Sequence, residues 1–259
     1  MDDPEIGAAK RAAAGPLGKE LAKYPLLFAK AVFFGRRPSR SHPTLVRNGT
    51  ITLADLGEGP IGITCHHVIE QYRNLRSQHD DILFQIGHIV MDPLPQLIAQ
   101  SARLDVAVIR LTDLQVRAIT SEGKIGSCLY LPKQWPPPEA KEGQFLSFGG
   151  FPGKLREAVD FDDLVFNSWS SGATEISSVS EHRLVSAFDR SCWVGAFGAR
   201  DKLDLTELGG LSGGPAFINR GLYWDLVGIV SDYHENYDAM FFAATSPIQP
   251  DGSISEPPQ

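Results

Sequence analysis

Cysteine is scarce in this sequence of 259 residues, which contains only Cys65, Cys128 and Cys192. An odd and sparse set of cysteines excludes a disulfide framework as the main source of stability. The acidic start, Met1–Glu5, also lacks the basic segment and apolar core of a secretory leader. We therefore expect three free thiols and a reducing, cytoplasmic location.

Long apolar runs and an excess of positive charge are missing as well. No stretch approaches the length of a membrane-spanning helix, so we expect no membrane span. The 31 acidic residues outnumber the 24 basic ones, which gives a net charge of −7. Binding to nucleic acid requires clustered Lys and Arg, so nucleic acid is not an expected partner.

Glycine and proline, by contrast, are plentiful, with 25 and 18 residues, in a chain of ordinary globular composition. Such a chain suits many short strands joined by turns. The expected strands are Val46–Ala54, Pro60–Thr64, Ile82–Val90, Val106–Leu111, Phe145–Phe148, Leu164–Trp169, Thr174–Val179, Arg183–Phe188, Pro215–Asn219, Trp224–Ser231 and Met240–Thr245. Strands at this spacing predict an all-β protein built from barrels.

The first 43 residues have a different pattern. Ala8–Ala14 is rich in alanine, and Leu17–Phe34 carries apolar residues at near-helical spacing, with Pro25 inside it. We predict an N-terminal helical extension over residues 1–43 that packs across the barrels; a membrane-surface or partner-binding helix is the alternative. The most loop-like interior stretch, Lys133–Glu139, divides the remainder into domains 44–132 and 133–259.

The most distinctive segment is Gly209–Pro215, in which Ser212 lies among four glycines just before an apolar strand. A serine that attacks a carbonyl needs backbone N–H groups aimed at the developing oxyanion. Gly210, two residues before the serine, can turn its amide toward that point because it has no Cβ. An ordinary glycine-rich turn is the alternative interpretation.

Two further segments supply a histidine and an aspartate in front of this serine. Gly62–Ile69 is strand-like and includes the neighbours His66 and His67, and Asp105 starts an alternating apolar strand. The order His, Asp, Ser along the chain is one of those known for the catalytic triad. Adjacent strand residues point to opposite faces, so only one of the two histidines can reach a cleft.

Together these segments resemble the trypsin/chymotrypsin-like serine protease superfamily, and in particular its bacterial branch. The matching residues are Thr64-x-x-His67-Val68, Asp105-Val-Ala-Val and Gly210-x-Ser212-Gly-Gly-Pro, and the resemblance extends over most of the chain, roughly Thr44 to Pro247. It implies two six-stranded antiparallel β-barrels packed together. It also implies peptide-bond hydrolysis without a cofactor, on a protein or peptide substrate.

The resemblance also implies a role for each matched residue. Ser212 would be the nucleophile, His67 the base and Asp105 the group that orients His67, with the amides of Gly210 and Ser212 as oxyanion donors. Ser231 and its neighbours would pair with the substrate backbone. The base of the specificity pocket falls on Thr206, with Glu207 next to it, and further walls come from Asp232-Tyr233 and Ala239-Met240. Thr206 favours a small or apolar substrate residue, whereas Glu207 turned inward would favour Arg or Lys.

Three other interpretations compete with a protease. An α/β-hydrolase needs its acid and histidine after the serine, yet His234 is the sole histidine in the 47 residues that follow Ser212. A metal site is not expected, because the consecutive residues Cys65, His66 and His67 cannot all face one ion from a strand. A catalytically silent, protease-like binding module stays open. A protease in the cytoplasm would damage other proteins unless its activity were controlled. A regulatory protein partner is one expected means of control.

Overall fold

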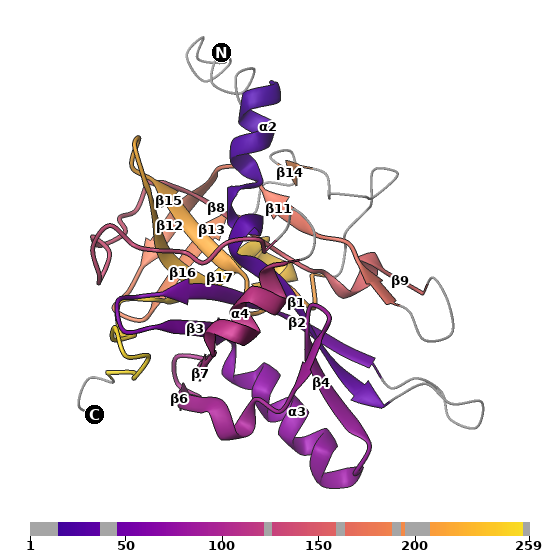
Figure 1. Ribbon diagram of the computed structural model, residues 1–259. Helices are drawn as coiled ribbons and strands as arrows, with labels where there is room; N and C mark the ends of the chain where they lie inside the picture. Colours follow the sequence, from indigo (N-terminus) through magenta and orange to yellow (C-terminus); the bar gives the residue numbers. More distant parts are fainter. Residues whose placement is uncertain are drawn as a thin grey trace.

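A computed structural model of the protein describes residues 15–36, 46–121, 126–158, 164–187, 193–194 and 208–255. This part of the chain is mostly β and has few helices (Figure 1). Two large antiparallel sheets dominate it, one from each half of the sequence. No helix within the described ranges is long and apolar enough to cross a membrane.

The first sheet has seven strands in the spatial order β5-β4-β1-β2-β3-β7-β6. In chain order the strands are β1 (Ala29–Arg36), β2 (Val46–Asp55), β3 (Pro60–Thr64), β4 (Ile82–Ile86), β5 (Ile89–Met91), β6 (Leu97–Ser101) and β7 (Val106–Arg110). Helix α3 (His66–Gln78) follows β3, the short 3-10 helix η2 (Leu94–Gln96) precedes β6, and helix α4 (Asp113–Thr120) follows β7. The sheet is curled but open, because no described pairing joins its edge strands β5 and β6.

The second sheet has eight strands in the order β12-β13-β17-β16-β15-β8-β11-β14. They are β8 (Phe145–Gly150), β11 (Trp169–Ser171), β12 (Thr174–Val179), β13 (Arg183–Ala187), β14 (Trp193–Val194), β15 (Pro215–Asn219), β16 (Trp224–His234) and β17 (Ala239–Ala244). The 3-10 helices η3 (Gly153–Leu155) and η5 (Glu235–Tyr237) and the small pair β9 (Arg156–Ala158) and β10 (Leu164–Phe166) complete this half.

An additional pairing of β12 with β8 closes six strands of the second sheet into a barrel. A closed barrel beside a curled sheet is the arrangement of a chymotrypsin-like double barrel, so the predicted fold class is confirmed. The expected strand count is correct for the closed barrel. It is wrong for the first sheet, where seven described strands form an open surface.

The N-terminal segment differs from the predicted helix over Leu17–Phe34. Helix α2 (Pro16–Ala22) is short, a 3-10 helix η1 (Tyr24–Phe28) follows, and β1 begins at Ala29. Strand β1 pairs with β2 and β4, so the first sheet begins well before residue 44. Six of the eight residues of β1 are buried, and they belong to both faces of the strand. Such a strand lacks the alternation of apolar and polar residues that distinguishes a strand from a helix in the sequence.

An aromatic cluster joins the two halves of the molecule. Tyr130, in the chain that leads from the first sheet to the second, has ring-centroid distances of 5.6 Å to Phe28 and 5.1 Å to Phe217. Its hydroxyl donates to the carbonyl of Trp224 at 3.0 Å and accepts from the amide of Leu226 at 3.2 Å. Tyr130 also forms a bridge with Ala54 in the first sheet. It therefore contacts both sheets by packing and by hydrogen bonds.

Candidate active site

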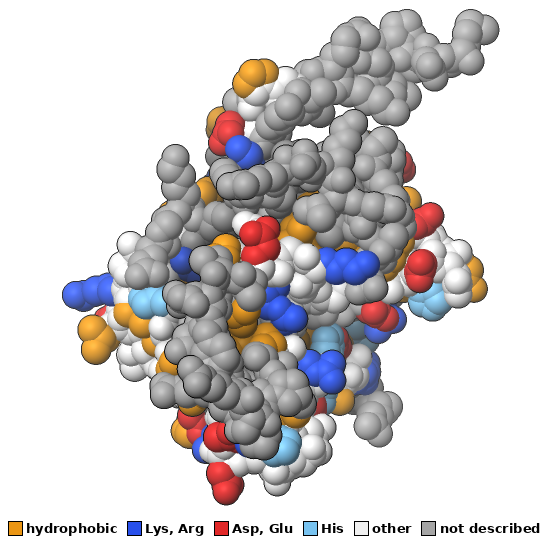
Figure 2. Space-filling view, turned by 90° about the vertical axis from the view of Figure 1, so that its right-hand side faces the viewer, with side chains coloured by type: hydrophobic (Ala, Val, Ile, Leu, Met, Phe, Trp, Pro, Cys, Tyr) orange, Lys and Arg blue, Asp and Glu red, His pale blue; other side chains and the backbone are white. Residues whose placement is uncertain are grey.

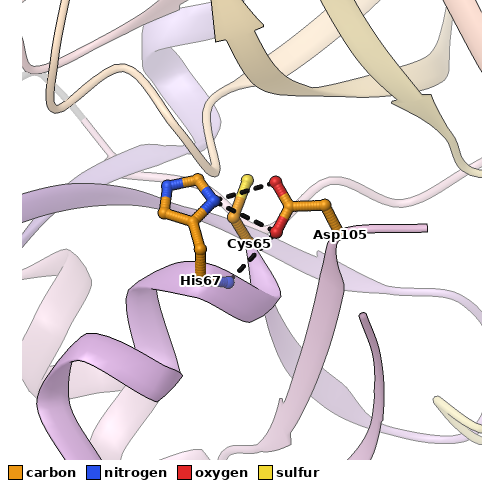
Figure 3. Close-up of side chains that lie close together, drawn as sticks. All are labelled: Cys65, His67 and Asp105. Carbon is orange, nitrogen blue, oxygen red and sulfur yellow. Dashed lines mark hydrogen bonds and ion pairs between the residues drawn. The ribbon is translucent and has the colours of Figure 1, made fainter. Parts of the chain in front are cut away.

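The His67–Asp105 pair forms at one end of the first sheet, where β3 and β7 are neighbours. Thr64 pairs with Ala107, so the residues that follow β3 meet those that precede β7. The Nδ1 atom of His67 lies 2.9 Å from Oδ2 and 3.0 Å from Oδ1 of Asp105 (Figure 3). Oδ1 also accepts the backbone N–H of His67 at 3.0 Å. These contacts fix both the carboxylate and the histidine ring.

Asp105 makes this contact from an uncommon backbone conformation. Its φ of 54° lies in the left-handed region, which aspartate tolerates better than most residues other than glycine. The expectation that Asp105 begins a strand is correct to within one residue, since β7 starts at Val106. Of the three aspartates that could compete for this role, Asp80, Asp81 and Asp92, two are engaged elsewhere: Asp81 pairs with Arg36 at 2.9 Å, and Asp92 pairs with Arg76.

The two neighbouring histidines lie in the first turn of helix α3 and not, as expected, at the end of a strand. Successive helical residues are about 100° apart around the axis, so the two rings still point in different directions. His67 faces Asp105, whereas the Nδ1 atom of His66 is buried without a hydrogen-bond partner among the described residues. Burial lowers the pKa of His66, which favours its neutral form.

Ser212 lies in the loop that enters β15, and hydrogen bonds connect this loop to both sheets. The amide of Thr50 in β2 donates to the carbonyl of Ser212 at 2.8 Å, and the amide of Gly213 donates to the carbonyl of Val230 at the same distance. The Ser212 hydroxyl donates to the carbonyl of Ser231 at 3.3 Å. No hydrogen bond joins it to His67 in the part of the chain described, although the two residues line one cavity.

The amide of Gly210 shares a peptide group with the carbonyl of Gly209, and the amide of Ser212 shares one with the carbonyl of Leu211. Both carbonyls are held by hydrogen bonds. Gly153 donates to the carbonyl of Gly209 at 2.7 Å, and Gly214 donates to the carbonyl of Leu211 at 2.8 Å. In a trans peptide the N–H points opposite to the preceding C=O. Both N–H groups are thus directed by fixed peptide planes, and neither has an acceptor among the described residues.

Gly210 is one of the positions in this loop that leave no room for a side chain. Its φ is 101°, a conformation that residues with a side chain rarely adopt. A Cβ there would overlap the side-chain nitrogen Nδ2 of Asn48 and lie 2.6 Å from the carbonyl oxygen of Phe151. The Gly210 carbonyl accepts the hydroxyl of Thr50 at 2.7 Å, which fixes its orientation. The glycine predicted to turn an amide at this point is therefore required by space and by backbone geometry.

A cavity of about 330 Å³ lies beside Ser212 on the side of β16 and β17. Three of the predicted wall residues, Asp232, Tyr233 and Met240, line it. Leu208, the last residue of the segment that leads into the serine loop, also lines it, as does Glu235, which was not anticipated, whereas the predicted wall residue Ala239 does not. Thr206 and Glu207, the predicted base of the pocket, lie outside the described residues.

A second cavity of about 360 Å³ contains the candidate triad. Its lining residues are His67, Asp105, Arg183, Ser212, Ser231 and Asp232. Arg183, in β13, was not anticipated, because a single arginine at the start of a strand gives no signal in the sequence. Ser212 and Asp232 line both cavities.

In the view of Figure 3, the Cys65 side chain lies between those of His67 and Asp105. Its Sγ and the ligand atoms of His67 and Asp105 are all within 4.8 Å of one another, a set of donors that a metal ion also uses. Each donor already has a partner, since the thiol donates to the carbonyl of Val230 at 3.0 Å and the other two bind each other. Burial, and then the nearby Asp105 carboxylate, raise the pKa of the Cys65 thiol, so it stays protonated at neutral pH. Cys65 and Cys128 are both free.

No known family model matches the sequence, and no curated protein matches it significantly. A search of solved structures finds many matches, among them a structure described as a thermostable serine protease AL20 from an extremophilic microorganism. It is 14% identical over 86% of this chain and 92% of that chain, with a TM-score of 0.45. A likeness of this extent assigns neither an activity nor a branch of a superfamily to this chain.

Proposed function

We propose that this protein is a serine endopeptidase that works through an acyl-enzyme. The single observation that supports this most is the convergence of three groups on one cavity. The groups that line this cavity are a histidine, the carboxylate bonded to it and a serine, and the loop that leads into this serine carries two amides without acceptors among the described residues. Each group has a separate task in acyl transfer, and the three tasks together make a complete reaction.

In the proposed reaction, the Ser212 hydroxyl attacks a peptide carbonyl while Nε2 of His67 takes its proton. The ring can accept it there because Asp105 holds the proton of Nδ1 and stabilises the imidazolium that forms. The amides of Gly210 and Ser212 donate to the oxyanion, and His67 returns the proton to the leaving amine. Water then hydrolyses the ester by the same base, which releases the acid and restores the serine hydroxyl.

The substrate backbone would bind along the free edge of β16. Strand β15 pairs with β16 only from Trp224 to Ile229, whereas β16 continues to His234. At Asp232–His234, β17 covers one edge, and no described strand covers the other. An extended peptide can add there as a further strand, with its scissile carbonyl next to Ser212. A protein or peptide substrate follows from this mode of binding.

One contact favours a second candidate, a catalytically silent binding module. The Ser212 hydroxyl donates to the carbonyl of Ser231 and not to His67. For the endopeptidase, a rotation of the serine side chain must bring this hydroxyl to His67 when substrate binds. A silent module would keep the observed contact and use the same cleft and β16 edge to hold a peptide without cutting it.

Labelling with a biotinylated fluorophosphonate separates these candidates, because the probe reacts with an activated serine. We expect one label per chain, located on Ser212 by mass spectrometry of the tryptic peptide. Ser212→Ala should abolish both labelling and hydrolysis of a casein substrate and leave the thermal melting curve close to that of the wild type. Absence of labelling in folded wild-type protein would favour the silent module.

A further inference from the structure

We propose that Arg183 determines specificity and binds an acidic side chain two or four residues before the cleaved bond. This inference rests on the proposed function, since it assigns a subsite to that cleft. Arg183 is an exposed residue of β13, yet it lines the cavity that contains His67 and Ser212. The cavity therefore holds a permanent positive charge close to the candidate nucleophile.

The register of three strands explains how Arg183 reaches the cavity from β13. Arg183 pairs with Ala243 of β17, and Phe241, two residues earlier in β17, pairs with Asp232 of β16. Residues at i and i+2 of a strand share a face, so the arginine and the phenylalanine ring lie on the same side. The guanidinium carbon is 5.4 Å from the centroid of the Phe241 ring. This cation–π contact directs the side chain across β17 toward the edge of β16.

The guanidinium has no acidic partner among the described residues. Asp232 lines the same cavity, but the two do not form an ion pair, and one Asp232 carboxylate oxygen accepts the amide of Tyr233 at 2.8 Å. A guanidinium carries a forked set of N–H donors that fits a carboxylate with two parallel hydrogen bonds. Arg183 thus presents unused donors to the place where a substrate would lie.

Strand alternation selects the substrate residues that can meet this cation. If the residue at the cut enters the cavity beside Leu208 and Met240, its neighbours alternate between the two faces of the added strand. The second and fourth residues before the cut then face Asp232, Phe241 and Arg183. Because the cation lies at the far side of Phe241, a long acidic side chain such as Glu reaches it more readily than Asp.

Matched covalent probes test this directly. The probes are acetyl tetrapeptide diphenyl phosphonates with alanine at the cut and either Glu or Gln at the second or the fourth residue before it. Glu and Gln differ only in charge, so the ratio of their labelling rates on Ser212 isolates the electrostatic preference. We expect a Glu/Gln ratio of about 5 at one of the two positions, the size of a partly exposed ion pair. The ratio should decrease as salt is added.

Variants then identify the residue responsible. Arg183→Gln should reduce the ratio to about one, Arg183→Lys should retain part of it, and Asp232→Asn should increase it, since it removes the competing charge. Arg117→Gln, an exposed arginine of α4 away from the site, is the matched control and should keep the wild-type ratio. A wild-type ratio of one at both positions, a preference for basic residues there, or an unchanged ratio in Arg183→Gln would each overturn the proposal.

Failure of the proposed function gives a different result. Wild-type protein that reacts with neither the phosphonates nor the fluorophosphonate is not an active serine peptidase. In that case fluorescein-labelled peptides of the same sequences are titrated against wild type and Arg183→Gln, with fluorescence polarisation as the readout. Tighter binding of the Glu peptide that disappears in the variant would keep Arg183 as an acid-binding residue of a silent module. Equal binding of both peptides would reject it.

Discussion

The two sheets contribute to the candidate site in different ways. The first supplies His67, in the helix that follows β3, and Asp105, just before its neighbour β7; the two are joined by hydrogen bonds of 2.9 and 3.0 Å. The second supplies Ser212, which lines the same cavity but donates its hydroxyl to Ser231 within its own sheet. Strand register fixes the relative position of groups within one sheet. Ser212 is positioned relative to the first sheet by hydrogen bonds that β2 donates to its loop, among them the one from the Thr50 amide to the Ser212 carbonyl at 2.8 Å.

The sharpest test of this comparison is to remove the base from the first sheet. We expect His67→Ala to reduce turnover on the order of 10⁶-fold, as loss of the base does in serine proteases. His66→Ala is the matched control, because the same helical turn carries both residues but only His67 contacts Asp105. Steady-state hydrolysis of casein peptides measures both. Reversed effects of the two substitutions would show that His66 is the base.

Asp105→Asn tests how much of the contribution of His67 to turnover depends on the orientation of its ring. We expect a loss of about 10⁴-fold in turnover, because an amide favours the wrong histidine tautomer. The thermal melting temperature should change little, since the amide can still accept the backbone N–H of His67. A loss of less than tenfold in folded protein would assign the orienting role to another group.

Tyr130→Phe weakens the connection between the two sheets. Without the hydroxyl, the buried amide of Leu226 and the half-buried carbonyl of Trp224 each lose a hydrogen-bond partner. We expect the free energy of unfolding to decrease by about 1–3 kcal/mol in a urea titration. Turnover should decrease as well if packing between the sheets positions Ser212 relative to His67. A loss of stability with unchanged turnover would contradict the idea that packing between the sheets positions Ser212 relative to His67.

The smallest expected effect concerns pH and the Cys65 thiol beside the His67–Asp105 pair. The pKa of Cys65 is raised in the folded protein. The thiol therefore contributes fully to the free energy of unfolding below the thiol pKa of the unfolded chain, and this contribution decreases as the pH rises above that pKa. We expect stability to decrease by at most about 1.4 kcal/mol per pH unit above pH 8.5 from this group. Burial raises the pKa of Tyr130 to about 12, which adds a decrease of the same sign at higher pH.

Urea titrations between pH 8 and 9.5 avoid most of the tyrosine contribution. Cys65→Ala is the comparison, since it removes the thiol and keeps Tyr130. The wild type should lose stability more steeply than this variant over the interval. Equal slopes in the two proteins would show that the thiol of Cys65 has the same pKa in the folded and unfolded chains.

Most of the strand positions could be predicted from the sequence, because alternating apolar residues and turn residues are local signals. Strands such as β2, β3, β12 and β15 begin and end within one or two residues of expectation. Strand β1 and the start of α3 were assigned the wrong type. Burial on both faces removed the alternation in β1, and the histidines at the start of α3 follow directly on the apolar strand β3.

The sequence by itself determined which groups are available to the site. A glycine run around Ser212, a histidine after one strand and an aspartate before another are local features that any fold must accommodate. The tertiary structure decided which of them meet. Pairing of β3 with β7 brings His67 to Asp105, and the path of the Arg183 side chain over Phe241 brings a cation into the cleft. These contacts join residues 38 and 58 positions apart in the chain, and only the packing of distant strands can specify them.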